Sequence, residues 1–182
     1  MKRRAILGSL LWTIACVFLA GPASAQLCWT VAGSTGTVDE EDLSRVSMAN
    51  ANLQVNSSAP LPAVVGARYS VTGISEDNGV TPRYWTVSLR YRDNGNGPDA
   101  RVQVMLQRQS FSSGTFTTLL NFDSNLYTQA SGFQTINFYS ACGVGGGFSF
   151  FSNLYFVEAT LTKSSAAGNP ALQMIQVCTW TC

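Results

Sequence analysis

The sequence predicts an all-β fold: a single-domain antiparallel β-sandwich, jelly-roll-like and stapled by disulfides. Three observations predict it. Apolar and polar residues alternate in short runs, which Gly, Asn, Asp, Ser and Pro separate. No long segment after residue 25 has the apolar spacing of an amphipathic helix. Four cysteines follow residue 25, and an even number favours disulfides in an exported chain.

Residues 1–25 have the pattern of a secretory signal peptide. Met1-Lys2-Arg3-Arg4 is basic, an apolar run follows, and Ala23-Ser24-Ala25 provides the small residues that signal peptidase recognises. A membrane anchor is the alternative, but the apolar run is shorter than the ~20 residues that span a bilayer. We therefore expect cleavage after residue 25, secretion to the periplasm or beyond, and one domain over 26–182 with no membrane span.

Charge and composition exclude several classes of function. Without residues 1–25 the chain keeps eight basic residues against ten acidic ones, a net charge of about −2. A nucleic-acid-binding protein needs a clustered basic surface, which this sequence lacks. The chain contains no histidine, so serine–histidine and cysteine–histidine catalysis are both excluded. We expect no cofactor and no enzymatic activity.

The strands are expected at regular spacing along the chain. The clearest is 84–92, where Trp85, Val87, Leu89 and Tyr91 alternate with polar residues and predict one buried face. Segment 93–99 predicts a hairpin loop to a strand at 101–109, and 110–116 predicts a second hairpin to 117–122. Further strands are expected at 28–31, 46–55, 67–74, 133–139, 154–162 and 171–178, with 164–170 joining the last two as a hairpin. Residues 39–48 are the one candidate for a short helix, with Asp39 as its N-cap.

The four cysteines are expected to form two disulfides. Zinc or thioredoxin-like chemistry would call for histidine or a CxxC motif, and the chain has neither. Cys178 and Cys182 cannot bond to each other on an extended strand, because four residues span about 13 Å and a disulfide needs Cα atoms within ~7 Å. A hairpin of the last two strands would bring Cys182 near Cys142. The predicted pairs are therefore Cys28–Cys178 and Cys142–Cys182.

The acidic residues could belong to a glycan hydrolase site or to a calcium site, but each of these interpretations has a simpler alternative. A glycan hydrolase would need two facing carboxylates, and Asp123 and Glu158 are the only acids outside turns and the 39–42 cluster. Glu158 lies on a strand face, where an ion pair with an arginine is the simpler explanation. The loop over residues 93–99 could also bind calcium through oxygen ligands. Its sequence departs from the EF-hand pattern, so a turn without a metal is favoured. The candidate calcium ligands are Asp93, Asn94, Asn96 and Asp99.

Binding or assembly is the function that remains. We expect a secreted, non-enzymatic binding or structural/assembly protein of the bacterial envelope or extracellular space. The alternative is a carbohydrate-binding module, in which aromatic rings stack on sugars and amides bind hydroxyls; a carboxylate-based glycan hydrolase comes third. Trp29, Tyr84 and Trp180 are the candidate ligand-contact aromatics. The partner is expected to be a glycan or an envelope protein.

Overall fold

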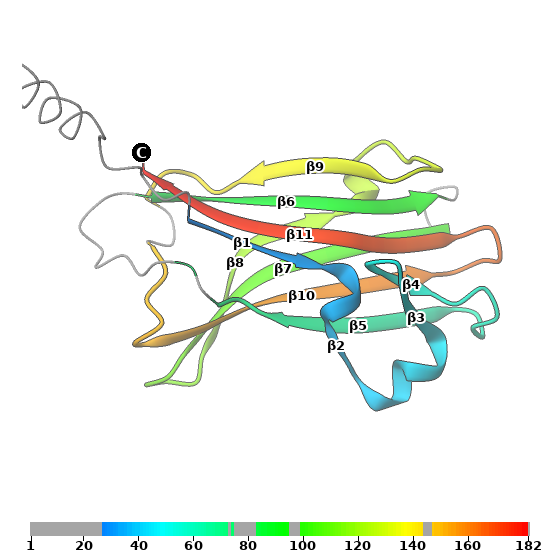
Figure 1. The fold of residues 1–182 in the computed structure, drawn as a ribbon, viewed down its shortest axis with the longest axis horizontal. Helices are drawn as coiled ribbons and strands as arrows, with labels where there is room; N and C mark the ends of the chain where they lie inside the picture. Colours follow the sequence, from blue (N-terminus) through cyan, green and yellow to red (C-terminus); the bar gives the residue numbers. More distant parts are fainter. Residues whose placement is uncertain (1–26, 73, 75–82, 95–98, 144–146, 182) are drawn as a thin grey trace, which may run out of the picture.

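Two antiparallel β-sheets packed face to face make up the protein (Figure 1). The computed structural model describes residues 27–72, 74, 83–94, 99–143 and 147–181. The predicted signal peptide, 1–25, lies outside these residues. The strands confirm the predicted all-β sandwich. In the part of the chain that the structure describes, no helix has the length and apolar character needed to cross a membrane.

The first sheet has six strands and the second has five. The six-stranded sheet has the order β3-β4-β11-β6-β9, with β1 also paired to β11. Its strands are β1 (Leu27–Ala32), β3 (Val46–Ala49), β4 (Asn52–Val55), β6 (Arg83–Asn94), β9 (Gln134–Tyr139) and β11 (Asn169–Thr181). The five-stranded sheet has the order β2-β5-β10-β7-β8. Its strands are β2 (Thr37–Val38), β5 (Ala63–Ser70), β7 (Ala100–Ser110), β8 (Phe116–Asp123) and β10 (Asn153–Lys163).

The connections give the fold its jelly-roll character. The eight strands from β4 to β11 fall into two groups of four, ordered 4-11-6-9 in one sheet and 5-10-7-8 in the other. This double Greek-key arrangement is that of a jelly roll. The short strands β1, β2 and β3 extend the two sheets at one edge. The predicted jelly-roll-like sandwich is confirmed.

Two of the predicted hairpins are wrong. Strands β6 and β7 lie in different sheets, and so do β10 and β11, so segments 93–99 and 164–170 connect the sheets instead of closing hairpins. Turn-forming residues show that the chain reverses, but they do not show whether the next strand joins the same sheet. The hairpin at 110–116 is confirmed: β7 pairs with β8, and Gly114 adopts a φ of 67° in the turn.

Two shorter predictions need correction as well. The strand expected over 46–55 is two strands, β3 and β4, which a tight turn at Asn50 and Ala51 joins with φ values of 52° and 65°. Alanine rarely adopts positive φ, so the sequence carried little sign of this turn. The expected short helix is a 3-10 helix, η2 (Glu40–Arg45), and Asp39 makes no side-chain hydrogen bond at its N-cap position.

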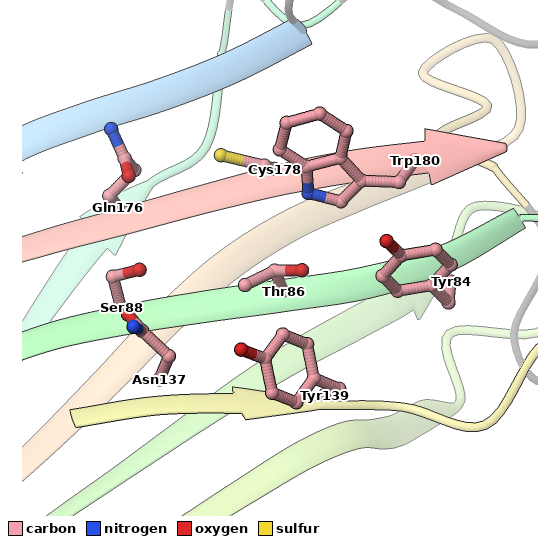
Figure 2. A pocket seen from close by; sticks show the side chains of 8 residues that line it. All are labelled: Tyr84, Thr86, Ser88, Asn137, Tyr139, Gln176, Cys178 and Trp180. Atoms are coloured by element: carbon pink, nitrogen blue, oxygen red, sulfur yellow. The ribbon is translucent and has the colours of Figure 1, made fainter.

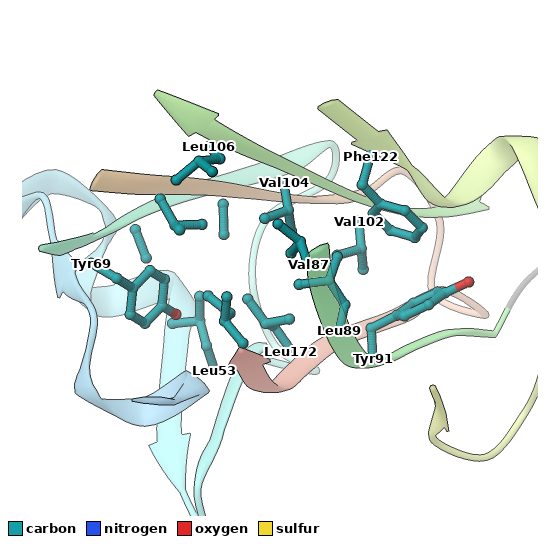
Figure 3. Close-up of a cluster of buried hydrophobic side chains, with 14 of the residues drawn as sticks. Leu53, Tyr69, Val87, Leu89, Tyr91, Val102, Val104, Leu106, Phe122 and Leu172 are labelled. Atoms are coloured by element: carbon teal, nitrogen blue, oxygen red, sulfur yellow. The ribbon is translucent and has the colours of Figure 1, made fainter. Parts of the chain in front are cut away.

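The core lies between the two sheets (Figure 3). The alternating residues of β6, from Trp85 to Tyr91, are at most 1% exposed, as the sequence predicted. Trp85 is the largest of these residues, and its ring packs edge-on against Phe148 with centroids 4.0 Å apart. Tyr155 contacts the same cluster from β10, in the opposite sheet. Aromatic packing therefore connects the two sheets in the core near the start of β6.

The only lysine after residue 25, Lys163, is buried at the end of β10. Its side chain is 3% exposed, and Nζ donates hydrogen bonds to the carbonyl oxygens of Asn56 and Ser57 at 3.4 and 3.3 Å. Carbonyl acceptors compensate part of the cost of removing an ammonium group from water. Lys163 thus ties the loop after β4 to the five-stranded sheet.

A disulfide joins the first and last described strands. Cys28 of β1 and Cys178 of β11 face each other in the antiparallel ladder with Cα atoms 4.1 Å apart, and their sulfurs are bonded. The first predicted disulfide is therefore present. Cys142 is also disulfide-bonded. Its predicted partner, Cys182, lies outside the described residues, so that pairing stays a prediction.

Candidate functional site

A shallow pocket of about 280 Å³ lies on the outer face of the six-stranded sheet (Figure 2). Strands β6, β9 and β11 supply its lining. The outward residues alternate with the buried ones, so each strand contributes every second side chain. The lining residues are Tyr84, Thr86, Ser88, Asn137, Tyr139, Gln176, Cys178 and Trp180.

Strand register brings these residues into three rows across the sheet. Trp180 pairs with Tyr84 in the first row. The second row joins Tyr139 of β9, Thr86 of β6 and Cys178 of β11. The third row contains Asn137, Ser88 and Gln176. Adjacent strands lie about 4.8 Å apart, so neighbouring side chains within a row can contact the same ligand.

The pocket has an aromatic end and a polar end. Tyr139 is 62% exposed and Trp180 is 38% exposed, and Tyr84 lies beside them half-buried. Figure 2 shows Ser88, Asn137 and Gln176 together at the other end. None of the lining side chains carries a formal charge. A neutral ligand with both apolar faces and hydroxyl groups would match this surface.

Two polar groups of the pocket differ in how they are held. The amide of Gln176 donates from Nε2 to Thr30 Oγ1 on β1 at 3.0 Å, which fixes its orientation. The hydroxyl oxygen of Thr86 is buried beneath the pocket surface and has no hydrogen-bond partner among the described residues. Cys178 lies beside Thr86, so the disulfide to β1 forms part of the pocket floor. This cross-link fixes the register of the strand that carries Trp180.

Of the three aromatic residues predicted to contact a ligand, two line the pocket and one lies on the inner face of the sheet. Tyr84 and Trp180 line the pocket side by side. Trp29 lies opposite buried Val177, on the inner face of the sheet, and packs against the core. The other lining residues were not predicted. Their outward positions could be read from the alternation, but only strand pairing shows that β6, β9 and β11 place them together.

The candidate catalytic carboxylates lie on the outer face of the other sheet. Glu158 accepts hydrogen bonds from Arg68 at 3.2 Å and from Gln107 at 2.8 Å. The predicted ion pair between Glu158 and an arginine is confirmed. Asp123 is held by both nitrogens of the Arg101 fork, and this hydrogen bonding lowers the pKa of Asp123. Each carboxylate is thus occupied by an arginine, on the face opposite to the pocket.

Three of the four calcium candidates lie in the part of the chain that the structure describes. Asp93 points into the sandwich, where its Oδ1 accepts a hydrogen bond from Gln134 at 3.1 Å. Asn94 follows on the opposite face of β6, and the carbonyl of Asp99 accepts from Ser164. Asn96 lies outside the described residues, so the four-residue set stays a prediction. Among the residues described, no three His, Cys, Asp or Glu side chains gather as metal ligands.

Buried Asp93 predicts a pH-dependent stability. Burial raises the pKa of Asp93, and hydrogen bonds such as that from Gln134 oppose this rise. The folded state therefore holds the proton more tightly than the unfolded state. Stability from this group is greatest below its ordinary pKa, near 4, and is lost as the pH rises through the folded-state pKa.

Asp93→Asn should abolish this loss, because an amide carries no charge and still offers an oxygen to Gln134. We expect the free energy of unfolding of Asp93→Asn, relative to that of the unmodified protein, to be larger at pH 7 than at pH 3.5, so that the variant is relatively more stable at pH 7. Urea unfolding at the two pH values measures this double difference, in which the other titrating groups cancel. An identical difference at both values would contradict the assignment.

Comparisons with known proteins identify no family for this chain. No protein family matches the sequence, and no curated protein sequence matches it. The solved structure of the "xylan-binding module CBM15" is similar with a TM-score of 0.47 and 9% identity, over 84% of this chain and 96% of that one. The CBM22-1 xylan-binding domain from Paenibacillus barcinonensis Xyn10C has a TM-score of 0.42 and 13% identity, over 84% and 86%.

A family two carbohydrate esterase from Cellvibrio japonicus is also similar, with a TM-score of 0.41 and 13% identity. This match covers 85% of the present chain but 34% of the esterase chain, so the protein spans about a third of that structure's length. All three TM-scores are below 0.5 and all three identities are at most 13%, so we draw no conclusion about this protein from these similarities.

Proposed function

We propose that this protein is a secreted, non-catalytic carbohydrate-binding domain that holds a glycan on the outer face of its six-stranded sheet. The observation that carries the proposal is the pocket, where three aromatic side chains adjoin neutral hydroxyl and amide groups. This proposal adopts glycan binding, the alternative from the sequence, in preference to envelope assembly.

The chemistry of sugars fits this lining. A sugar ring presents C–H groups on its faces and hydroxyl groups around its edge. Trp180, Tyr84 and Tyr139 offer aromatic surface to the faces, and such rings contribute binding energy with little loss of conformational freedom. Ser88, Asn137 and Gln176 both donate and accept hydrogen bonds, as hydroxyl partners must.

Two observations support the absence of catalysis and the secreted location. The pocket lining includes no carboxylate, while Glu158 and Asp123 are paired with arginines on the opposite sheet. A disulfide such as Cys28–Cys178 forms and persists in oxidising compartments, which supports export.

The proposal predicts that truncation of the pocket aromatics abolishes glycan binding without unfolding the protein. We expect Trp180→Ala and Tyr84→Ala each to weaken binding at least tenfold, as for an aromatic residue at the centre of a binding surface. Affinity electrophoresis against xylan, cellulose, β-mannan and laminarin identifies the glycan. Calorimetry with the matching oligosaccharide then gives the dissociation constants.

Two control variants test whether a loss of glycan binding is specific to the pocket. Phe151→Ala removes an aromatic side chain that is 91% exposed and does not line the pocket, and Glu158→Gln removes a carboxylate from the opposite sheet. Both should bind like the unmodified protein. Equal binding by the pocket variants and the controls would disprove the pocket as the site. If the protein binds none of these four polysaccharides, and neither polygalacturonate, dextran sulfate nor their neutral counterparts, the proposed function is disproved.

A further inference from the structure

Two arginines continue the outer face of β6 beyond the polar end of the pocket. Arg90 and Arg92 follow Ser88 at two-residue steps, so all three point outward from the same strand. Arg90 donates from Nε to Gln173 Oε1 at 2.5 Å and from Nη1 to Thr135 Oγ1 at 3.4 Å. Tyr84 and Arg90 are six residues apart on the strand, or about 20 Å. An extended ligand could therefore reach from the aromatic end to the arginines.

The guanidinium groups of Arg90 and Arg92 lie close to the same aromatic ring. The Cζ atoms of Arg90 and Arg92 lie 5.8 and 5.1 Å from the centroid of the Phe133 ring. Arg92 is also anchored by hydrogen bonds to the carbonyl of Asn169 and to Gln54 Oε1, both at 3.1 Å. These partners position the two cations, and all of them are neutral, so they do not cancel the charge of either guanidinium group.

The two sheets differ in how their outward arginines are paired. On the five-stranded sheet, Arg68 pairs with Glu158 and Arg101 with Asp123. The strands of the six-stranded sheet contain a single acid, Asp93, and it is buried on the inner face. Within the described part of the chain, no carboxylate forms an ion pair with Arg90 or Arg92. The chain after residue 25 has a net charge of about −2, and against this background Arg90 and Arg92 form a local concentration of positive charge that none of the described carboxylates pairs.

We infer that Arg90 and Arg92 form an anion subsite of the glycan site, and that the natural ligand is an acidic glycan carrying a carboxylate or sulfate group. This inference rests on the proposed function. The row of Thr135 and Arg90 directly follows the row of Asn137, Ser88 and Gln176. Neutral sugar rings would occupy the pocket while the anionic substituent meets the guanidinium forks, whose planar N–H groups match such anions.

The test compares acidic polysaccharides with neutral counterparts that differ only at the charged group. The uronate pair is polygalacturonate and its carboxyl-reduced form; the sulfate pair is dextran sulfate and dextran. We expect one acidic member to bind about tenfold more tightly than its neutral counterpart at low salt, as for a charge-assisted hydrogen bond. This preference should shrink in 0.5 M NaCl, because salt screens exposed charges.

The double variant Arg90→Gln with Arg92→Gln should lose the preference and keep its affinity for the neutral member. Arg68→Gln, an outward arginine on the opposite sheet, is the control and should keep it. Equal binding of acidic and neutral members by the unmodified protein, or a preference that survives the double variant, would overturn this inference alone. If the unmodified protein binds neither these pairs nor the neutral panel, glycan binding itself fails, and the inference with it.

Discussion

Trp85→Ala is expected to lower the free energy of unfolding by about 3–5 kcal/mol, the typical cost of removing a buried tryptophan side chain. The ring is fully buried and contacts Phe148 and Tyr155, so its loss leaves a cavity between the sheets. Domains of this size are stable by about 5–15 kcal/mol, and the variant would approach the limit of folding. Urea unfolding followed by far-ultraviolet circular dichroism measures the loss.

Two further variants make the Trp85 result interpretable. Trp85→Phe keeps an aromatic ring in the cluster and should show a smaller loss, which remains measurable if the alanine variant does not fold. Phe111→Ala removes a side chain that is 62% exposed and should change stability by less than about 1 kcal/mol. A loss at Trp85 no larger than that at Phe111 would contradict the packing described for the core.

Removing the Cys28–Cys178 disulfide is expected to destabilise the protein by about 4–5 kcal/mol. The bonded residues are 150 positions apart, and the chain-entropy model assigns a cross-link of this span an effect of that size. Replacing both cysteines with serine avoids a lone thiol. The unfolded chain of this variant expands, so the dependence of the unfolding free energy on denaturant should also steepen.

A matched control for the disulfide exists on the same two strands. Thr30 and Gln176 form the next outward pair, and their side chains share one hydrogen bond. Replacing both with alanine should cost about 1 kcal/mol. If the serine variant loses no more than this control, the disulfide is not the main tie between β1 and β11.

The strands could be predicted from the sequence because one local pattern determines them. Alternation along β6 identified Trp85 to Tyr91 as buried, and the positions of most other strands followed in the same way. Which sheet a strand joins depends on pairing between distant segments, and alternation carries no information on it. That is why β6 and β7, which follow each other in sequence, were expected in one sheet and lie in two.

The disulfide illustrates a correct prediction reached through an incorrect step. The prediction of Cys28–Cys178 depends on a β10–β11 hairpin that would place Cys182 near Cys142, and that hairpin does not exist. The bond forms because β1 pairs with β11 and the register puts Cys28 opposite Cys178. The same limit applied to the pocket: Tyr84 and Trp180 were candidates individually, while Tyr139 required knowledge that β9 lies beside β6.

The burial of Lys163 has a practical consequence for chemical labelling of this protein. Lys163 is the only lysine after residue 25 and is 3% exposed, so the described residues present no exposed lysine amine. Amine-selective acylating reagents would therefore leave the side chains of the two folded sheets unmodified. Unfolding would expose the amine, so acylation at Lys163 would report on opening of the sandwich.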